Sequence, residues 1–177
     1  MRGRDRLVPV AGRKGLRPSR DVNMNNLPQR KHPVHPPPVE RMHQPTVLHV
    51  TVCLNDDHLR LDNPTTHNAL RKVWSEATAW RVGHYTVMPD HVHLFCAPAV
   101  FPPTSVKLWA KYWKGQFRRL LNLDRSVWQR DVWDTQMRNF AHYVEKHAYV
   151  EQNPVRRGLV ERPEDWPYRG EMHVIRW

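Results

Sequence analysis

The chain has 177 residues, enough for one domain of ordinary size with a substantial core and flanking segments. It holds 28 Lys and Arg against 17 Asp and Glu, a formal net charge of +11, which is typical of a protein that binds a polyanion such as nucleic acid. No apolar run approaches the roughly 18 residues that a membrane span needs, and no apolar segment follows the basic start, which argues against a secretory signal. The two cysteines, Cys53 and Cys96, lie in apolar stretches without a CxxC pair, which favours buried thiols of a cytoplasmic protein.

Residues 1–46 differ in composition from the rest of the chain. They contain ten basic residues, three acidic residues and eight of the sixteen prolines. Because this segment has few apolar residues and no periodicity, it has too little to bury to offset the entropy lost on ordering. We therefore predict a mostly disordered basic arm at 1–46, serving solubility or unspecific phosphate contact, and a folded domain at 47–177.

The folded part is predicted to begin with a strand at 47–54, which is rich in β-branched residues. Capping residues at 63–66 and apolar residues at helical spacing predict a helix that runs to about Trp80. Two short strands follow, at 85–88 and 92–95, joined by a tight connection at Pro89-Asp90.

A second helix is predicted from about 104 to 122, with an apolar stripe and a basic stripe. A charged stripe is often only a solvated face, but cations without an acid among them favour contact with a nucleic-acid backbone, which makes binding depend on salt. The DNA-binding residues predicted here are Lys107, Lys111, Lys114, Arg118 and Arg119.

A weak edge strand at 127–134 and a helix at 140–152 complete the predicted order β-α-β-β-α-β-α. The dipeptide Asn153-Pro154 is expected to stop the last helix, because the residue before proline avoids helical backbone angles. This order suits an α+β fold, namely a ferredoxin-like antiparallel sheet with helices packed on one face.

His91 and His93 carry the clearest chemical signal in the chain. Alternate residues of a strand point to the same face, so the two imidazoles form half of a metal site. Tyr149 and Asn153 are four residues apart at the end of a predicted helix and would project together. The hypothesis is one centre in which His91, His93 and Asn153 hold a divalent cation and the Tyr149 hydroxyl is directed at a phosphate.

Each of these residues also has a simpler explanation. A His-x-His pair can be merely structural, and a tyrosine on an amphipathic helix is most often part of the core. Tyr143, on the same predicted helix as Tyr149, competes for the role of nucleophile. Imidazole also suits zinc, so the pair could join other histidines in a zinc site: His84, His142 and His147. Two other functions therefore stay open, a zinc-dependent hydrolase that uses water and a DNA-binding module without catalysis.

Four stretches of the chain resemble the REP-associated tyrosine transposases, part of a wider group of single-tyrosine transposases with a His-hydrophobic-His (HUH) motif. They are YTVMPDHVHLF, WKGQFRRLLN, VWQRDVWD and YVEQNPVRRGLVERPEDWPY, and the match spans roughly residues 47–168 in the same order. The resemblance implies a ferredoxin-like catalytic domain that cleaves single-stranded DNA at the foot of hairpins with Mg²⁺ or Mn²⁺. It implies a 5′-phosphotyrosine with a free 3′-hydroxyl, Tyr149 as nucleophile, and His91, His93 and Asn153 as metal ligands.

Two positions depart from the pattern of these transposases: Asp90 stands where Asn is more common, and Arg157 where Ala is common. The expected partner is single-stranded or hairpin DNA, and the expected location is the cytoplasm, in association with the nucleoid. The sequence leaves open which hairpin is recognised and whether the protein acts as a monomer or a homodimer.

Overall fold

The structure is a computed structural model that describes residues 46–56 and 58–175. Apart from Thr46, the predicted basic arm lies outside these residues. The strands are β1 (Leu48–Cys53), β2 (Trp80–Val87), β3 (His91–Pro98), β4 (Trp133–Gln136) and β5 (Arg169–Glu171). The helices are α1 (Pro64–Glu76), α2 (Val106–Leu120), α3 (Phe140–Glu151), α4 (Asn153–Arg156) and the 3₁₀ turn η2 (Pro163–Asp165). Within the described residues, no helix combines the length and the hydropathy that a bilayer crossing requires.

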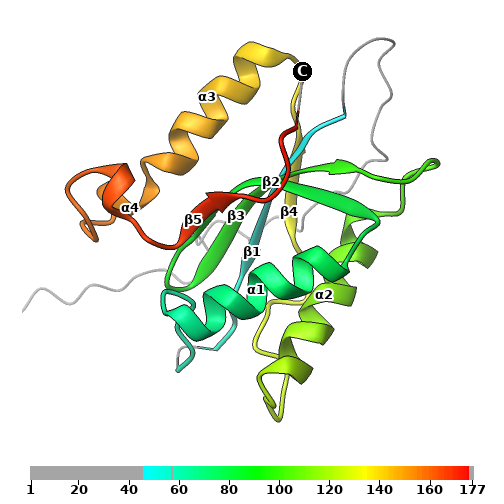
Figure 1. Cartoon of the computed structure of the whole chain (residues 1–177), viewed down its shortest axis with the longest axis vertical. Coiled ribbons are helices and arrows are strands. Elements are labelled where there is room, and N and C mark those ends of the chain that lie inside the picture. Colours follow the sequence, from blue (N-terminus) through cyan, green and yellow to red (C-terminus); the bar gives the residue numbers. More distant parts are fainter. Residues whose placement is uncertain (1–45, 57, 176–177) are drawn as a thin grey trace, which may run out of the picture. The chain divides into compact units, whose positions relative to one another are not determined.

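The strands pair in an antiparallel sheet with the order β4-β1-β3-β2-β5 (Figure 1). The first four strands, with α1 and α2 between them, have the connectivity of a ferredoxin-like fold, and β5 extends the sheet at the edge of β2. The predicted α+β class and ferredoxin-like sheet are therefore confirmed.

One face of the sheet is covered by α1 and α2, which lie side by side (Figure 1). α1 begins where capping predicts, because the Asn63 side chain accepts a hydrogen bond from the Thr66 backbone amide and Pro64 occupies the first turn. Inward-facing residues of β1, β2 and β3 form the main core with the apolar stripes of both helices. At its centre the buried rings of Trp74 in α1 and Trp113 in α2 meet edge to face, with centroids 6.0 Å apart.

The third helix packs on the opposite face, which corrects the expectation that all helices share one face. Leu94 and Cys96 of β3 face the main core, whereas Phe95 between them packs with Val150 of α3 in a second, smaller cluster. The Tyr143 ring of α3 meets Phe95 edge to face at 5.0 Å between centroids. His91, His93 and Phe95 are spaced two residues apart along β3, so their side chains point to the same face. α3 packs against Phe95 and therefore covers the face that carries both histidines.

Three elements near the end of the chain differ from the sequence prediction. β4 starts at Trp133 rather than at 127, because Trp128 forms only an isolated bridge with Leu54. α3 ends at Glu151, within one residue of the predicted end, but Pro154 lies in the first turn of a further short helix, α4, where its missing amide hydrogen has no helical partner to lose. β5 is not predicted by the sequence pattern, since it is a strand of three residues in a turn-rich segment.

Candidate active site

Strand register places several side chains in one row across the face under α3. Thr51 of β1 pairs with His93 of β3 on one side and with Trp133 of β4 on the other. His93 also pairs with Thr86 of β2, and Thr86 pairs with Arg169 of β5. Since paired residues of antiparallel strands project to the same face, these side chains form a polar row with His93 at its centre.

The rings of His91 and His93 converge, with their Nε2 atoms 3.1 Å apart. His91 Nδ1 donates to Asp90 Oδ1 at 2.7 Å, which leaves His91 Nε2 as an acceptor. His93 Nδ1 lies 2.9 Å from Thr51 Oγ1 and 3.2 Å from His49 Nε2. Partners behind each ring therefore fix its orientation, as they do for metal-binding histidines.

Burial keeps these imidazoles neutral, which is the form that ligates metals. It lowers the pKa of His93 to about 2 and that of His49 to about 4. It also lowers the pKa of His91, although the hydrogen bond to Asp90 opposes the change. Two ligands at right angles and about 2.1 Å from one ion lie about 3.0 Å apart, close to the observed 3.1 Å. The His91–His93 pair therefore fits a shared divalent cation.

The two positions that depart from the family pattern contact each other. Arg157 Nη2 donates to both oxygens of the Asp90 carboxylate, at 2.9 and 3.2 Å. Burial raises the pKa of Asp90, but the hydrogen bonds from Arg157 and His91 outweigh it, so the pKa lies below its usual range. Asp90 therefore stays ionised and links the end of α4 to the back of His91.

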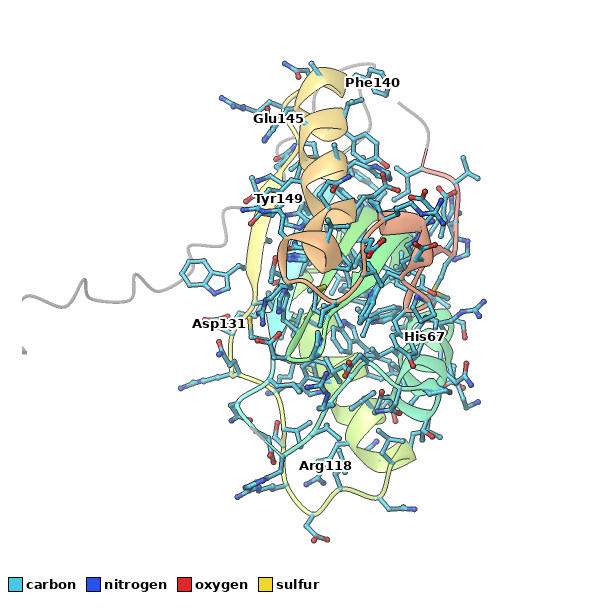
Figure 2. The ribbon with its side chains drawn as sticks, turned by 90° about the vertical axis from the view of Figure 1, so that its left-hand side faces the viewer. His67, Arg118, Asp131, Phe140, Glu145 and Tyr149 are labelled. Carbon is cyan, nitrogen blue, oxygen red and sulfur yellow. The ribbon has the colours of Figure 1, made fainter. Side chains whose placement is uncertain are left out.

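Tyr149 lies on α3 and is 44 % exposed (Figure 2). Two cations flank its ring: Lys146 Nζ is 5.3 Å and the guanidinium carbon of Arg156 is 4.6 Å from the ring centroid. The charge of Lys146 also contributes to the low pKa of His93. Lys146 therefore lies beside the phenol ring and its charge acts on the histidine pair, but no hydrogen bond or ring contact among the described residues joins Tyr149 to either histidine.

Asn153 opens α4 directly after Gln152, and its side chain is only 9 % exposed. Its amide Nδ2 is buried with no hydrogen-bond partner among the described residues, and the same holds for Thr86 Oγ1, beside His93 in the polar row. Buried polar atoms without a protein partner are rare and call for a specific explanation. In this arrangement, no hydrogen bond within the described part of the chain joins Asn153 or Tyr149 to His93.

Tyr143, the competing tyrosine, is less suited to attack a phosphate. Its ring packs against Phe95 and, at 6.4 Å between centroids, against Phe140. Burial, with the negative charges of Glu171 and Glu151, raises the pKa of its hydroxyl. A raised pKa makes the phenolate of Tyr143 harder to form, which weighs against Tyr143 as a nucleophile.

The alternative zinc site that would combine the pair with other histidines is not formed among the described residues. His84 and His147 gather instead with Glu151, in the one described cluster of three His, Cys, Asp or Glu side chains whose ligand atoms could share a metal. His142 lies at the start of α3, where its Nδ1 accepts a hydrogen bond from the backbone amide of Arg138.

The predicted DNA-binding residues of α2 have different environments. Lys114 is 9 % exposed, and its Nζ donates to the carbonyls of Gln129 and Arg130 at 2.9 and 3.1 Å, while burial lowers its pKa to about 8. Lys114 therefore fastens this loop to α2 rather than facing solvent. Lys107 pairs with Asp131 at 2.9 Å.

The exposed cations of α2 lie on the other face of the sheet from α3, and Figure 2 shows Arg118 and Tyr149 well apart. Except for Arg119, whose guanidinium lies 3.5 Å from Gln116 Oε1, they line a groove of about 490 Å³ between α2 and the loop that leads to β4. This basic groove includes Lys107, Lys111, Arg118 and Arg130.

Sequence reasoning missed two residues near the site, Lys146 and Trp133. Trp133 is 46 % exposed at the sheet edge, whereas the other six tryptophans among the described residues are buried. Its place in the polar row depends on the pairing of β4 with β1, and no local sequence signal separates it from the tryptophans of the core. Lys146 could have been found from its spacing of three residues from Tyr149 on a helix.

No protein-family model matches the chain. Two curated proteins resemble part of it. The REP-associated tyrosine transposase of Escherichia coli K12 is 27% identical over 89 residues, 50% of this chain and 53% of that protein. A Haemophilus influenzae protein that is provisionally given the same name is 31% identical over 96 residues, 46% of this chain and 53% of that protein. The chain spans about half the length of these curated relatives.

A solved structure of a REP-associated tyrosine transposase bound to a REP hairpin has the same fold, with a TM-score of 0.63 and 23% sequence identity. The match covers 74% of this chain and 80% of that chain. Together with the two curated relatives, this structure confirms the resemblance that the sequence motifs indicate: the chain is similar to the REP-associated tyrosine transposases.

Proposed function

We propose that this chain cleaves and rejoins single-stranded hairpin DNA through a covalent bond to Tyr149. The observation that carries the proposal is the convergence of two neutral imidazole nitrogens, 3.1 Å apart, on the face of the sheet that is covered by α3, the helix of Tyr149. The similarity to REP-associated tyrosine transposases supports the class of substrate, since the solved relative is bound to a REP hairpin.

His91 and His93 would hold a divalent cation, Mg²⁺ or Mn²⁺, through their Nε2 atoms, with Asn153 supplying an amide oxygen. When bound, such a cation makes a phosphate more electrophilic and neutralises the charge that develops on its oxygens. Two imidazoles and one amide carry no charge themselves, so the full positive charge of the cation acts on the substrate. Asp90 and Thr51 keep the rings in place from behind.

Tyr149 would act as the nucleophile. Its hydroxyl loses a proton to solvent, its oxygen bonds to phosphorus, and the bond from phosphorus to the 3′ oxygen breaks. That oxygen takes up a proton, so the products are a 5′-phosphotyrosine and a free 3′-hydroxyl, and rejoining is the reverse reaction. Lys146 and Arg156, which flank the ring, would attract the phosphate and stabilise its charge.

The basic groove and the histidine pair lie on opposite faces of the sheet, so the DNA would run around the edge strand β4 to contact both. Cations of the basic groove would contact backbone phosphates on one side, which positions the strand without reading its sequence. Trp133, exposed at the edge and in the row of His93, would stack on an unpaired base next to the cleaved phosphate. Homodimer formation and association with the nucleoid remain predictions of the sequence resemblance.

The test is to incubate the full chain with end-labelled hairpin DNA and Mn²⁺ and to look for a protein–DNA adduct that survives denaturation. We expect the adduct with the unchanged chain and none with Tyr149→Phe. Tyr112→Phe is a matched control, because Tyr112 is 50 % exposed on α2, away from the site, and should leave the adduct intact.

An adduct that persists in Tyr149→Phe and disappears in Tyr143→Phe would overturn the assignment of the nucleophile. Hairpin cleavage without any adduct would favour a hydrolase that uses water. Hairpin binding that is unaffected by chelators and by His91→Ala, with neither cleavage nor adduct, would favour a binding module without catalysis.

A further inference from the structure

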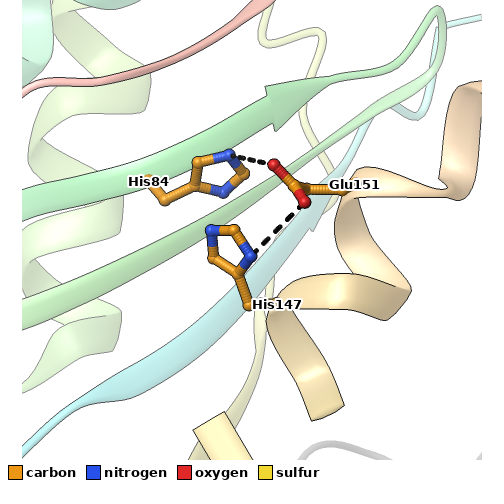
Figure 3. Close-up of side chains that lie close together, drawn as sticks. All are labelled: His84, His147 and Glu151. Atoms are coloured by element: carbon orange, nitrogen blue, oxygen red, sulfur yellow. Dashed lines mark ion pairs between the residues drawn. The ribbon is translucent and has the colours of Figure 1, made fainter. Parts of the chain in front are cut away.

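We propose that His84, His147 and Glu151 bind a zinc ion that fastens α3 to β2, at a site separate from the His91–His93 pair. His84 lies in β2, whereas His147 and Glu151 are one helical turn apart in α3 (Figure 3). One nitrogen from each ring and one carboxylate oxygen all lie within 4.8 Å of one another. Side chains from two elements far apart in the sequence therefore present three metal-ligand atoms to one point.

The distances within this cluster are too long for hydrogen bonds. Glu151 Oε1 lies 3.6 Å from His84 Nε2, and Glu151 Oε2 lies 3.6 Å from His147 Nδ1 (Figure 3). Burial, with the charges of His147 and Arg169, lowers the pKa of His84 to about 4, so at neutral pH His84 has no charge with which to form an ion pair. Ligands of a tetrahedral zinc ion, with bonds of about 2.0–2.1 Å, are about 3.4 Å apart. Each of the two nitrogen–oxygen distances is near this value, and one ligand atom from each of the three residues lies within 4.8 Å of the others.

The position of His84 results from an irregularity in β2. The register with β3 shifts between Val82 and Tyr85, and both of these residues face the main core. A bulge of this kind can re-aim a side chain, and here it turns His84 toward α3, with its ring centroid 4.1 Å from that of His147. His84 Nδ1 is buried with no hydrogen-bond partner among the described residues, so hydrogen bonding does not explain the burial of the ring.

The ligand set favours zinc over other divalent ions. Two imidazoles and a carboxylate are a common set of three protein ligands for zinc, with water in the fourth position. The three side chains are 11%, 28% and 33% exposed, which leaves access for that water. Arg169 Nη1 lies 3.4 Å from Glu151 Oε1, the oxygen that is also 3.6 Å from His84 Nε2, whereas Oε2 is 3.6 Å from His147 Nδ1. A carboxylate can accept from a guanidinium at one oxygen and ligate a metal through the other.

Zinc at this point would restrain the part of α3 that carries Tyr149, because Tyr149 lies between His147 and Glu151 in the sequence. The position of Tyr149 relative to His93 would then depend on the occupancy of the zinc site. This consequence rests on the proposed function, whereas zinc binding by the cluster does not.

The test uses the full chain freed of metal by a chelator, with His91→Ala as background so that the histidine pair does not compete. Zinc is titrated by calorimetry, and retained metal is measured by elemental analysis after gel filtration. We expect the background variant to bind one zinc ion per chain and to melt at a higher temperature with zinc. Adding His147→Ala or Glu151→Gln should abolish the thermal shift and weaken binding by more than the roughly 10–100-fold that losing a hydrogen-bond partner of a ligand costs, since a ligand itself is lost.

His142→Ala in the same background is the control, since His142 is on α3 but outside the cluster, and it should leave zinc binding unchanged. If His147→Ala does not fold, as judged by circular dichroism, Glu151→Gln decides the question because it keeps the size of the side chain. The proposal is overturned if the background variant binds no zinc, or if the substitutions leave its affinity unchanged. The two proposals are tested separately. If no zinc binds at the cluster, Tyr149 can still form the adduct, and if no adduct forms, the cluster can still bind zinc.

Discussion

The contact between Asp90 and Arg157 offers a test of how the chain supports its proposed metal site. Arg157 donates to both oxygens of the Asp90 carboxylate, which also accepts from His91. We expect Arg157→Ala and Asp90→Asn each to lower the free energy of unfolding. The double variant should lose less than the sum of the two, because the residues interact with each other.

The magnitude follows from the exposure of the pair. The side chains of Asp90 and Arg157 are 57% and 48% exposed, so solvent screens their attraction, and the coupling free energy should be about 0.2–1 kcal/mol. The effect on the metal should be larger, because Asp90 also accepts the hydrogen bond from His91 Nδ1. Removing such a partner from behind a ligand typically weakens metal binding by about 10–100-fold, and we expect this for Asp90→Ala.

The assay combines urea unfolding of the four proteins in a double-mutant cycle with Mn²⁺ titration of Asp90→Ala. Because the pair is exposed, its coupling should decrease in high salt. A matched control is the pair Arg162–Asp165, whose side chains are exposed to a similar degree and which lies in η2; breaking it should leave Mn²⁺ affinity unchanged. A coupling of zero at low salt, together with unchanged Mn²⁺ affinity in Asp90→Ala, would refute the reasoning.

Three further predictions concern Trp133, Lys114 and the buried histidines. Trp133→Ala should weaken hairpin binding by about 1–3 kcal/mol in a fluorescence-anisotropy titration, with Trp133→Phe intermediate, because one stacked base is lost; equal affinity of all three proteins would exclude a stacking role. Lys114→Met should lower the free energy of unfolding by about 1–3 kcal/mol, because the carbonyls of Gln129 and Arg130 lose their donor. Lys111→Met should instead reduce DNA affinity and its salt dependence without loss of stability. The opposite pattern in denaturant and binding curves would reverse these roles. His49 and His93 have folded pKa values of about 4 and about 2, below the ordinary 6.5, so the unfolded chain takes up protons first as the pH falls. The contribution of these two histidines to the free energy of unfolding is therefore present above pH 6.5. Below pH 6.5 it should be lost by roughly 1 kcal/mol per histidine per pH unit. A urea midpoint of the chelated protein that does not change between pH 7 and pH 5.5 would contradict this prediction.

The sequence alone was sufficient to predict the strands and helices that depend on local signals. Alternation of polar and apolar residues identified β1 and β3, and with them the common face of His91 and His93, because a strand repeats every second residue. Helical spacing and the Asn63 cap identified α1, and the apolar stripe identified α2. These predictions concern residues within one element, where backbone geometry decides which side chains share a face.

Only the tertiary structure decided which distant residues meet. The contact of Asp90 with Arg157, the grouping of His84 with Glu151 and the position of Trp133 beside Thr51 join segments that lie 67, 67 and 82 residues apart in the chain. No periodicity encodes such contacts, because they follow from strand order, a β-bulge and the packing of α3 on the second face of the sheet. The buried position of Lys114 within an otherwise basic stripe has the same origin: the loop that covers it, including Gln129 and Arg130, is brought there by the fold.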